Sequence, residues 1–201
     1  MVKVMIIANH KPIAIIGYQE SSMTQEFVNE ISKTHEYTII GTKDFFDQPD
    51  NRYQYIVSVS WDREERKRVV DQIDTLGFDL ITVIQDYTLL GIHPKPVIHP
   101  GTFIFGFCDI AIGSTIGRHC IIGRHTLIGH HVVVGNNCIT RPSVIVNDKS
   151  QVGNNCIFNT RATVTNKTVV CDDVELLAFS AFTKNIDQPG RYAGIPARKI
   201  A

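Results

Sequence analysis

Residues 109–135 read DIAIGSTIGRHCIIGRHTLIGHHVVVG, and every sixth residue from Ile110 to Val134 is isoleucine or valine. The period continues in both directions and gives fifteen positions, fourteen of them apolar: Ile98, Ile104, Ile110, Ile116, Ile122, Ile128, Val134, Thr140, Val146, Val152, Phe158, Val164, Val170, Leu176 and Phe182. A period of six is neither the helical nor the strand period. The second half of the chain is therefore an internal repeat.

Two further rows accompany the apolar one. Small or β-branched residues stand two places earlier: Cys108, Ser114, Cys120, Thr126, Val132, Cys138, Val144, Ser150, Cys156, Ala162, Thr168, Val174 and Ser180. Glycines stand one place later, at 117, 123, 129, 135 and 153. Three six-residue segments predict one turn of a parallel β-helix, with aliphatic side chains inside, small ones at the corners and glycine where the backbone angle is unusual. Residues 98–187 predict five such coils.

The cysteines follow from the same repeat. Four of the five, Cys108, Cys120, Cys138 and Cys156, lie on the small-residue row, and no C-x-x-C pair occurs. A free cysteine packs as a small buried apolar residue. We therefore expect packing residues rather than a disulfide framework, and nothing marks Cys171, off the row, as reactive.

Residues 13–90 follow a different pattern. Apolar runs predict strands at Ile13–Ile16, Tyr37–Ile40, Tyr55–Val59 and Leu80–Ile84, and capping-box patterns predict helices from Ser22 and from Asp62, the second ending at Gly77. Strands that alternate with helices predict a small parallel βαβ domain. We place the domains at residues 1–92 and 93–201. Residues 1–11 are left open as an extra strand or a leader.

The composition excludes several classes of protein. Twenty Lys and Arg balance twenty Asp and Glu, which argues against nucleic acid or an anionic membrane as the main partner. No apolar run approaches the length of a membrane span, and the apolar stretch at the N-terminus is too short for a signal sequence. We expect a soluble, cytoplasmic protein.

Ligands of a parallel sheet bind beyond the carboxyl ends of its strands. Here those ends are the segments Gly17–Ser22, Gly41–Asp44 and Ser60–Asp62. The first loop has one glycine instead of the three of a dinucleotide-binding loop. Two interpretations of this loop remain: a phosphate-binding site, or a plain turn into the helix.

The order of these parts resembles the hexapeptide-repeat sugar acyltransferases typified by sialic acid O-acetyltransferase and bacillosamine N-acetyltransferase. The landmarks that carry the resemblance are Tyr37–Gly41, Leu80–Ile84, Pro100–Ile104, Ile128–His130 and Gly194–Ile200. It implies an α/β, Rossmann-like N-terminal domain that binds a nucleotide sugar, followed by an all-β left-handed parallel β-helix. It also implies a homotrimer with acetyl-CoA bound between neighbouring helices.

The resemblance also implies a catalytic histidine. His130 aligns with that residue, and it should project outward because it follows the inward Ile128 by two places. A histidine titrates near neutral pH and suits a general base. The family usually has an acid nearby that orients the ring, whereas the next residue here is His131. We assign His130 and His131 to the catalytic site; either another acid serves, or the base is weaker, or the protein is not a transferase.

The remaining site residues come from the same resemblance. The donor residues implied are Ile139, Thr160 and Ala178 along the pantetheine arm and Gly194, Ile195 and Pro196 near the adenine, with Lys184, Arg191, Arg198 and Lys199 as candidates for the phosphates. Asn159 and Leu177 stand where the family often has glycine. The acceptor residues implied are Gly17, Asp44 and Ser60.

Together these features predict an acetyl-CoA-dependent acetyltransferase that acts on an amino group of a nucleotide-linked sugar in surface-glycan synthesis. A sugar O-acetyltransferase and a non-catalytic, trimeric nucleotide-sugar-binding relative remain as alternatives. A metal hydratase on the same helix would need histidines stacked at multiples of eighteen residues, and no two histidines differ by 18 or 36. We therefore expect no metal.

Overall fold

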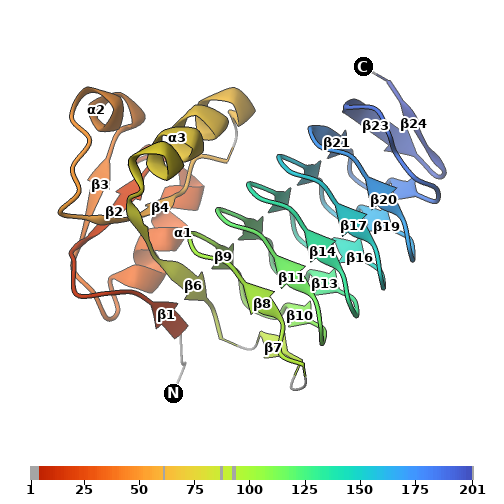
Figure 1. Ribbon diagram of the computed structural model, residues 1–201, viewed down its shortest axis with the longest axis horizontal. Helices are drawn as coiled ribbons and strands as arrows, with labels where there is room; N and C mark the ends of the chain where they lie inside the picture. Colours follow the sequence, from red (N-terminus) through yellow and green to blue (C-terminus); the bar gives the residue numbers. More distant parts are fainter. Residues whose placement is uncertain (1–4, 61, 87, 92–93, 201) are drawn as a thin grey trace. The chain divides into compact units, whose positions relative to one another are not determined.

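The computed structural model describes residues 5–60, 62–86, 88–91 and 94–200 (Figure 1). The chain divides into two compact units, one running from Val4 to Val83 and the other covering Ile84–Ala201. Each unit has a hydrophobic cluster of its own. The two units are therefore described separately.

The first unit contains a four-stranded parallel sheet. Its strands are β2 (Ile13–Ile16), β3 (Tyr37–Ile40), β4 (Gln54–Val57) and β5 (Asp79–Leu80), in the order β3-β2-β4-β5. Strand β2 pairs in parallel with β3 on one side and with β4 on the other. The chain thus changes direction across the sheet between β2 and β4, and a crevice at their carboxyl ends is where such sheets bind ligands.

Helices bury the sheet. They are α1 (Ser22–Ile31), α2 (Thr42–Asp47) and α3 (Arg63–Leu76). One cluster joins alternate sheet residues to α2 and α3: Ala14, Ile16, Phe45, Tyr55, Val57, Val59, Val69 and Ile73. The intervening Ile13, Ile15 and Ile56 are buried too, and α1 contacts β2. Burial on both faces explains the nearly continuous apolar runs of these strands.

The predicted ends of the helices are partly confirmed. The Asp62 side chain accepts a hydrogen bond from the Glu65 N–H at 2.8 Å, and Gly77 ends α3 with a φ of 65°. The predicted cap at Ser22 was wrong, because Ser21 is the N-cap and makes no side-chain cap bond. The short helix α2 was not predicted.

The predicted strand Leu80–Ile84 is two strands, because the chain leaves the four-stranded sheet after β5. The second piece is β6 (Thr82–Ile84). At the N-terminus, Met5–Ile7 form a short strand, β1, beside β6.

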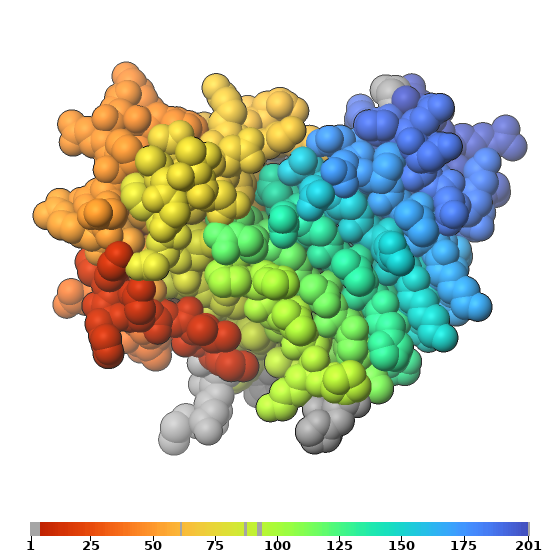
Figure 2. Space-filling model, viewed as in Figure 1, coloured from red at the N-terminus to blue at the C-terminus, as the bar shows by residue number. Residues whose placement is uncertain are grey.

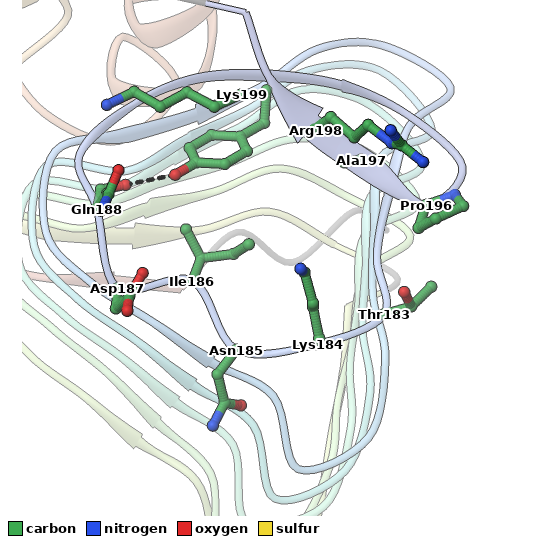
Figure 3. A pocket seen from close by; sticks show the side chains of 11 residues that line it. Thr183, Lys184, Asn185, Ile186, Asp187, Gln188, Pro196, Ala197, Arg198 and Lys199 are labelled. Carbon is green, nitrogen blue, oxygen red and sulfur yellow. Dashed lines mark hydrogen bonds between the residues drawn. The ribbon is translucent and has the colours of Figure 1, made fainter.

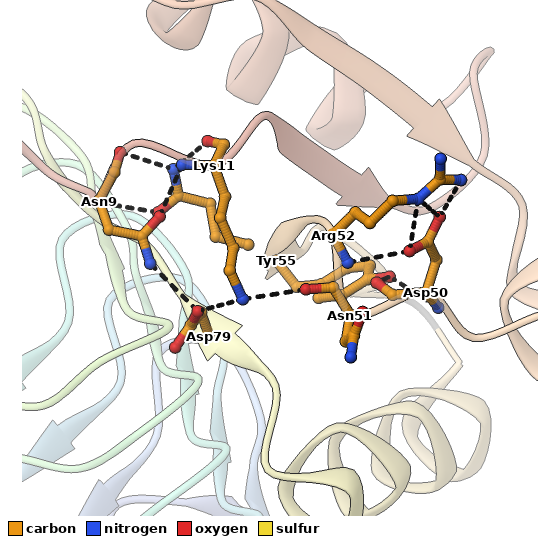
Figure 4. Close-up of polar contacts among 8 residues, drawn as sticks. Asn9, Lys11, Asp50, Asn51, Arg52, Tyr55 and Asp79 are labelled. Atoms are coloured by element: carbon orange, nitrogen blue, oxygen red, sulfur yellow. Dashed lines mark hydrogen bonds and ion pairs between the residues drawn. The ribbon is translucent and has the colours of Figure 1, made fainter.

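Polar contacts close the amino end of the sheet (Figure 4). The Lys11 Nζ lies 2.7 Å from Asp79 Oδ2 and donates to the Asn51 carbonyl at 2.9 Å. The Lys11 ammonium lowers the pKa of the Asp79 carboxyl. Both side chains are about half exposed, so the pair fixes the chain before β2 more than it stabilises the fold.

The second unit is a parallel β-solenoid with three faces. The first face holds β7 (Leu89–Leu90), β10 (Asp109–Ile110), β13 (Leu127–Ile128), β16 (Ile145–Val146), β19 (Thr163–Val164) and β22 (Ala181–Phe182). The second holds β8 (Val97–Ile98), β11 (Thr115–Ile116), β14 (Val133–Val134), β17 (Gln151–Val152) and β20 (Val169–Val170). The third holds β9 (Phe103–Ile104), β12 (Ile121–Ile122), β15 (Ile139–Thr140), β18 (Ile157–Phe158), β21 (Val174–Leu176), β23 (Gly190–Gly194) and β24 (Ala197–Lys199).

Three corners join the faces. The first corner follows the first face, and includes residues 111–113, 129–131 and 147–149. The second follows the second face, and includes 117–119, 135–137, 153–155 and 171–173. The third follows the third face, and includes 123–125, 141–143, 159–161 and 177–179. The coils stack along the chain, and their side chains form parallel bands from green to blue (Figure 2).

The register confirms a coil of eighteen residues. Ile110 pairs with Ile128, and Ile128 with Val146. Among the described residues, the strands give five full coils from β7 to β21 and part of a sixth. The end coils differ: Leu90 pairs with Ile110, twenty residues on, and Val170 bridges to Ile186, sixteen residues on. The strict period of six therefore does not extend into them.

The rows of the repeat take their predicted places. From Ile104 to Phe182 the apolar row is buried, and so is the whole small-residue row, including its four cysteines. The Sγ of Cys138 donates to the Gly153 carbonyl at 3.1 Å, and burial raises the pKa of this thiol well above its usual value.

The role predicted for the glycine row was wrong. The positive φ angles fall two residues later and belong mostly to other residues, such as His119 (56°) and His131 (57°). The glycines are needed for close stacking instead. A Cβ on Gly135 would lie 2.6 Å from the Gly153 carbonyl oxygen in the next coil.

Candidate functional site

His130 lies at the first corner, just after β13. Its side chain is 58% exposed, which confirms that it projects outward. Its backbone N–H donates to Asp148 Oδ1 at 2.8 Å, and its ring Nδ1 lies 3.8 Å from Asp148 Oδ2. Asp148 occupies the same corner one coil later. The acid missing from the position after His130 is thus present in the neighbouring coil.

Sequence reasoning missed Asp148 although the repeat contains the signal. Asp148 follows His130 by eighteen residues, one full coil. In a coil of this length, the spatial neighbour of a corner residue is found by adding or subtracting eighteen.

His131 is turned toward a different coil from His130. A Cβ on Gly113, in the preceding coil, would lie 2.4 Å from the His131 Nδ1, so the imidazole rests against that glycine. Its backbone N–H donates to the Ile112 carbonyl at 3.1 Å. His131 thus fills a left-handed corner position and packs on the preceding coil.

The residues implied for the donor do not gather in one place. Thr160 and Ala178 are stacked at the third corner, where the N–H of Phe179 donates to the Thr160 carbonyl at 3.0 Å. Ile139 lies on the third face and is only 3% exposed. Within one chain, His130 and Thr160 occupy corners on opposite sides of the first face.

A pocket lies at the C-terminal end of the solenoid (Figure 3). Its volume is about 550 Å³, and it is lined by Thr183, Lys184, Asn185, Ile186, Asp187, Gln188, Tyr192, Pro196, Ala197, Arg198 and Lys199. Figure 3 shows the Lys184 side chain pointing into it. Three of the four cations predicted for phosphates therefore line one pocket, and such groups suit phosphate oxygens.

Arg191, the fourth cation, and Ile195 lie outside this lining, whereas Pro196 belongs to it. The Arg191 Nε donates to Glu175 Oε2 at 2.9 Å. Gly194 and Ala197 pair across the β23–β24 hairpin, so Ile195 and Pro196 form its turn, and Ile195 is 73% exposed.

A second, smaller cavity lies in the first unit at the carboxyl ends of β2 and β4. Its volume is about 90 Å³, and it is lined by Tyr18, Ser21, Ser58, Val59, Ser60, Asp62 and Glu65. The Tyr18 hydroxyl donates to Glu65, and the Thr42 hydroxyl donates to the same carboxylate at 2.6 Å. The bond to Glu65 raises the pKa of Tyr18. These contacts join the loops that follow β2 and β3 to the start of α3.

The three residues implied for the acceptor lie in different surroundings. Gly17 is buried, and a Cβ there would be 2.1 Å from the Ser58 hydroxyl, which is hydrogen-bonded to Thr24 at 2.8 Å. Asp44 is exposed in the first turn of α2 and does not line the small cavity. Ser60 lines that cavity and is 4% exposed. Tyr18, Thr42 and Glu65 were not predicted.

The described residues contain neither a metal-binding cluster nor a membrane-spanning helix. The described residues contain no group of three or more His, Cys, Asp or Glu side chains arranged to hold a metal ion. No helix within them is long and apolar enough to cross a membrane.

The comparisons with known proteins rest on structure. No protein-family model matches the sequence, and no curated protein sequence does. A variant of perosamine N-acetyltransferase from Caulobacter crescentus, in complex with CoA and GDP-perosamine, matches with a TM-score of 0.81 at 15% identity, over 96% of this chain and 98% of that one.

Two further solved structures match over nearly the whole chain. The acetyltransferase domain of PglB from Neisseria gonorrhoeae, in complex with acetyl coenzyme A, gives a TM-score of 0.82 at 17% identity, over 96% of this chain and 100% of that one. WeeI from Acinetobacter baumannii gives a TM-score of 0.72 at 14% identity, over 94% of this chain and 100% of that one.

At these identities the matches establish the fold. They agree with the eighteen-residue coils, the inward aliphatic row and the α/β unit that precedes them. The chain therefore has the left-handed β-helix fold found in sugar N-acetyltransferases, as the family resemblance implied.

Proposed function

We propose that the protein is an acetyltransferase that moves the acetyl group of acetyl-CoA to an amino group of a nucleotide-linked sugar. The observation that carries the proposal is the His130 imidazole, exposed at a corner of the β-helix with a carboxylate 3.8 Å away. Support comes from solved structures of the same fold, one with CoA and GDP-perosamine bound and one with acetyl coenzyme A.

In this proposal His130 acts as a general base. The sugar amine attacks the thioester carbonyl, and His130 takes a proton from the attacking nitrogen. The new C–N bond forms, the C–S bond then breaks, and the proton passes to the departing thiolate of CoA. No covalent enzyme intermediate is needed, and the thiols of the small-residue row are buried.

We propose that the protein is a homotrimer. The outward residues of the first face include Leu89, Leu127 and Ile145, and those of the second face include Val97, Val133 and Val169; all six are 37–66% exposed. Columns of exposed apolar side chains are typical of surfaces that other chains cover. Copies packed on these two faces would cover both columns.

The donor would lie along that interface. Thr160 and Ala178 form a stacked column suited to the linear pantetheine arm. The pocket lined by Lys184, Arg198 and Lys199 would receive phosphates, with the Gly194–Pro196 turn close to it. Ile139 is buried, and the proposal gives its side chain no contact with the donor.

The first unit would bind the nucleotide of the acceptor. We propose that it is a Rossmann-like domain within residues 1–92, and that the β-helix domain includes residues 93–201. Its four parallel strands and the cavity after β2 and β4 support this. Gly17 and Ser60 lie at that edge, and Asp44 is exposed on α2, where its carboxylate could accept hydrogen bonds from a base or a ribose. A cytoplasmic place in surface-glycan synthesis fits these substrates.

The test is acetyl transfer to defined acceptors. The protein is incubated with acetyl-CoA and with UDP-, dTDP- and GDP-linked amino sugars, and products are identified by mass spectrometry. We expect one amino sugar to gain an acetyl group, and His130→Ala to lower turnover by about 10²–10⁴-fold. Acetylation only of sugars without an amino group would indicate the O-acetyltransferase instead.

Binding measurements separate the non-catalytic alternative. Acetyl-CoA at about 100 times its Kd should stabilise the folded protein by roughly 2.7 kcal/mol in a thermal-shift assay. A protein that binds nucleotide sugars but neither binds acetyl-CoA nor acetylates any acceptor would be a binding relative, and the proposal would fail.

A further inference from the structure

We propose that Asp148 is a positioning residue for His130: its carboxylate, one coil away, holds the imidazole in the orientation and protonation state that the base requires. This inference rests on the proposed function for its catalytic meaning. The contact itself can be tested without any substrate.

Each carboxylate oxygen of Asp148 has a separate task. Oδ1 accepts the hydrogen bond from the His130 backbone N–H at 2.8 Å, and Oδ2 faces the ring Nδ1 at 3.8 Å. The first contact fixes the carboxylate on the residue it serves. The second places a negative charge beside one ring nitrogen, which leaves Nε2 as the nitrogen that takes a proton from the acceptor. This separation exceeds a hydrogen bond, so the carboxylate acts on the ring through its charge, which favours a proton on the nitrogen beside it.

The first of these tasks does not require a carboxylate. Elsewhere in the solenoid the same bond between coils is made by amides: Asn136 Oδ1 accepts from the Arg118 N–H at 2.9 Å, and Asn154 Oδ1 from the Asn136 N–H at 2.8 Å. An asparagine at position 148 could therefore keep the structural bond. The charge is what distinguishes Asp148 from these amides.

The chain also contains a carboxylate in the same geometry without a histidine. Asp172 Oδ1 accepts from the Asn154 N–H at 2.7 Å at the second corner. Asp172 also accepts from the Asn154 side-chain amide at 3.2 Å. Asp172→Asn is therefore a matched control for Asp148→Asn. Both substitutions remove a carboxylate charge from a bond between neighbouring coils, but only Asp148 lies beside a histidine ring.

Other charged groups near His130 act in the opposite direction. His131 follows it in the chain, and Lys149 is exposed beside Asp148, with its N–H bonded to the His130 carbonyl at 2.8 Å. Neither of them offers the ring a negative charge. Asp148 is the acidic residue in contact with the ring, so its removal leaves His130 among neutral or positive neighbours at this corner.

The experiment compares D148N with D172N in the whole chain. The tautomer of the His130 ring is followed by NMR of its ring nitrogens, assigned with His130→Gln. We expect D148N to change the balance between the two tautomers, because the carboxylate beside Nδ1 has lost its charge. D172N should leave that balance unchanged. An unchanged balance in D148N, or an equal change in both variants, overturns the proposal.

Kinetics supply a second readout. For the acetyl transfer proposed above, D148N should move the acidic limb of the kcat/KM profile to lower pH and lower its plateau about three- to tenfold. D148E, which keeps the charge, should recover part of the plateau. An unchanged profile would refute the role. Absence of transfer in the unmodified protein would refute the proposed function, while the NMR of the His130 ring would still decide whether Asp148 acts on it.

Folding does not confound the outcome. If D148N does not fold, D148S takes its place, because a hydroxyl can accept the same backbone N–H and carries no charge. The expected change in the tautomer balance of His130 is the same for both variants.

Discussion

Gly129 allows Asp148 to approach His130, and replacing it with alanine should break that contact. A Cβ at Gly129 would lie 2.3 Å from Asp148 Oδ1 and 2.8 Å from the Asp148 backbone nitrogen. Real Cβ contacts below 3.0 Å are essentially absent, so both the side chain and the coil must move. The φ of Gly129 is not positive, so the cost is steric and does not come from backbone strain.

The expected cost comes from two sources. Forcing an extra carbon into a packed position costs about 1–3 kcal/mol. Losing the bond from the His130 N–H to Asp148 adds about 1 kcal/mol. G129A should therefore lower the free energy of unfolding by about 2–4 kcal/mol and reduce acetyl transfer about as much as D148N does.

Gly153 provides the matched control. A Cβ there would meet Asp172 Oδ1 at 2.3 Å and the Asp172 nitrogen at 2.6 Å, a clash of the same kind without a histidine. Urea unfolding at one protein concentration should give similar losses of unfolding free energy for G129A and G153A, whereas only G129A should change the NMR signals of the His130 ring. If G129A unfolds within about 0.5 kcal/mol of the unmodified protein, or if G153A changes the His130 signals equally, the stacking argument is refuted.

Four further predictions follow from the same structure. Replacing Lys184 and Arg198 with glutamine should raise the KM for acetyl-CoA about tenfold or more, and leave kcat largely unchanged, because the loss is in phosphate binding. Val133→Glu should convert the proposed trimer to monomers in light scattering, since a charge would be buried in the apolar column; an unchanged mass would exclude that face. Asp62→Ala should cost about 1 kcal/mol of stability by removing the α3 cap, measured by urea unfolding. Burial raises the pKa of Cys108 to about 11, above the usual 9.0 of a thiol; the unfolded thiol therefore ionises first, stability should fall as pH rises from 9 to 11, and Cys108→Ala should reduce that fall in thermal unfolding.

Most of the solenoid could be predicted because its interior repeats. Each coil places an aliphatic side chain inward every six residues, so Ile116, Ile122 and Ile128 report the same environment. The end coils could not be predicted this way, because they depart from eighteen residues. The glycine row was correctly located and misinterpreted: close approach between coils and a left-handed backbone both favour glycine, and the sequence alone does not separate these causes.

The first unit was predictable where local patterns act alone. Asp62 and Gly77 end a helix whose apolar residues have clear spacing, and both were confirmed. The helix α2 has only six residues, too few for a periodic pattern. The break at Ile81 separates β5 from β6, which belong to different sheets. Which sheet each strand joins depends on pairing partners that are distant in the sequence.

The candidate site illustrates the same limit more sharply. His130 was found from its neighbours in the chain, and the acid was sought there too, yet the described contact comes from the next coil. In a parallel β-helix, residues eighteen apart in the chain are stacked as neighbours in adjacent coils. The acid beside a catalytic base can therefore come from the next residue or from the next coil, and the base keeps the same position in both cases. A substitution such as histidine at position 131 then does not by itself indicate lost activity. It indicates that the stack above and below must be examined first.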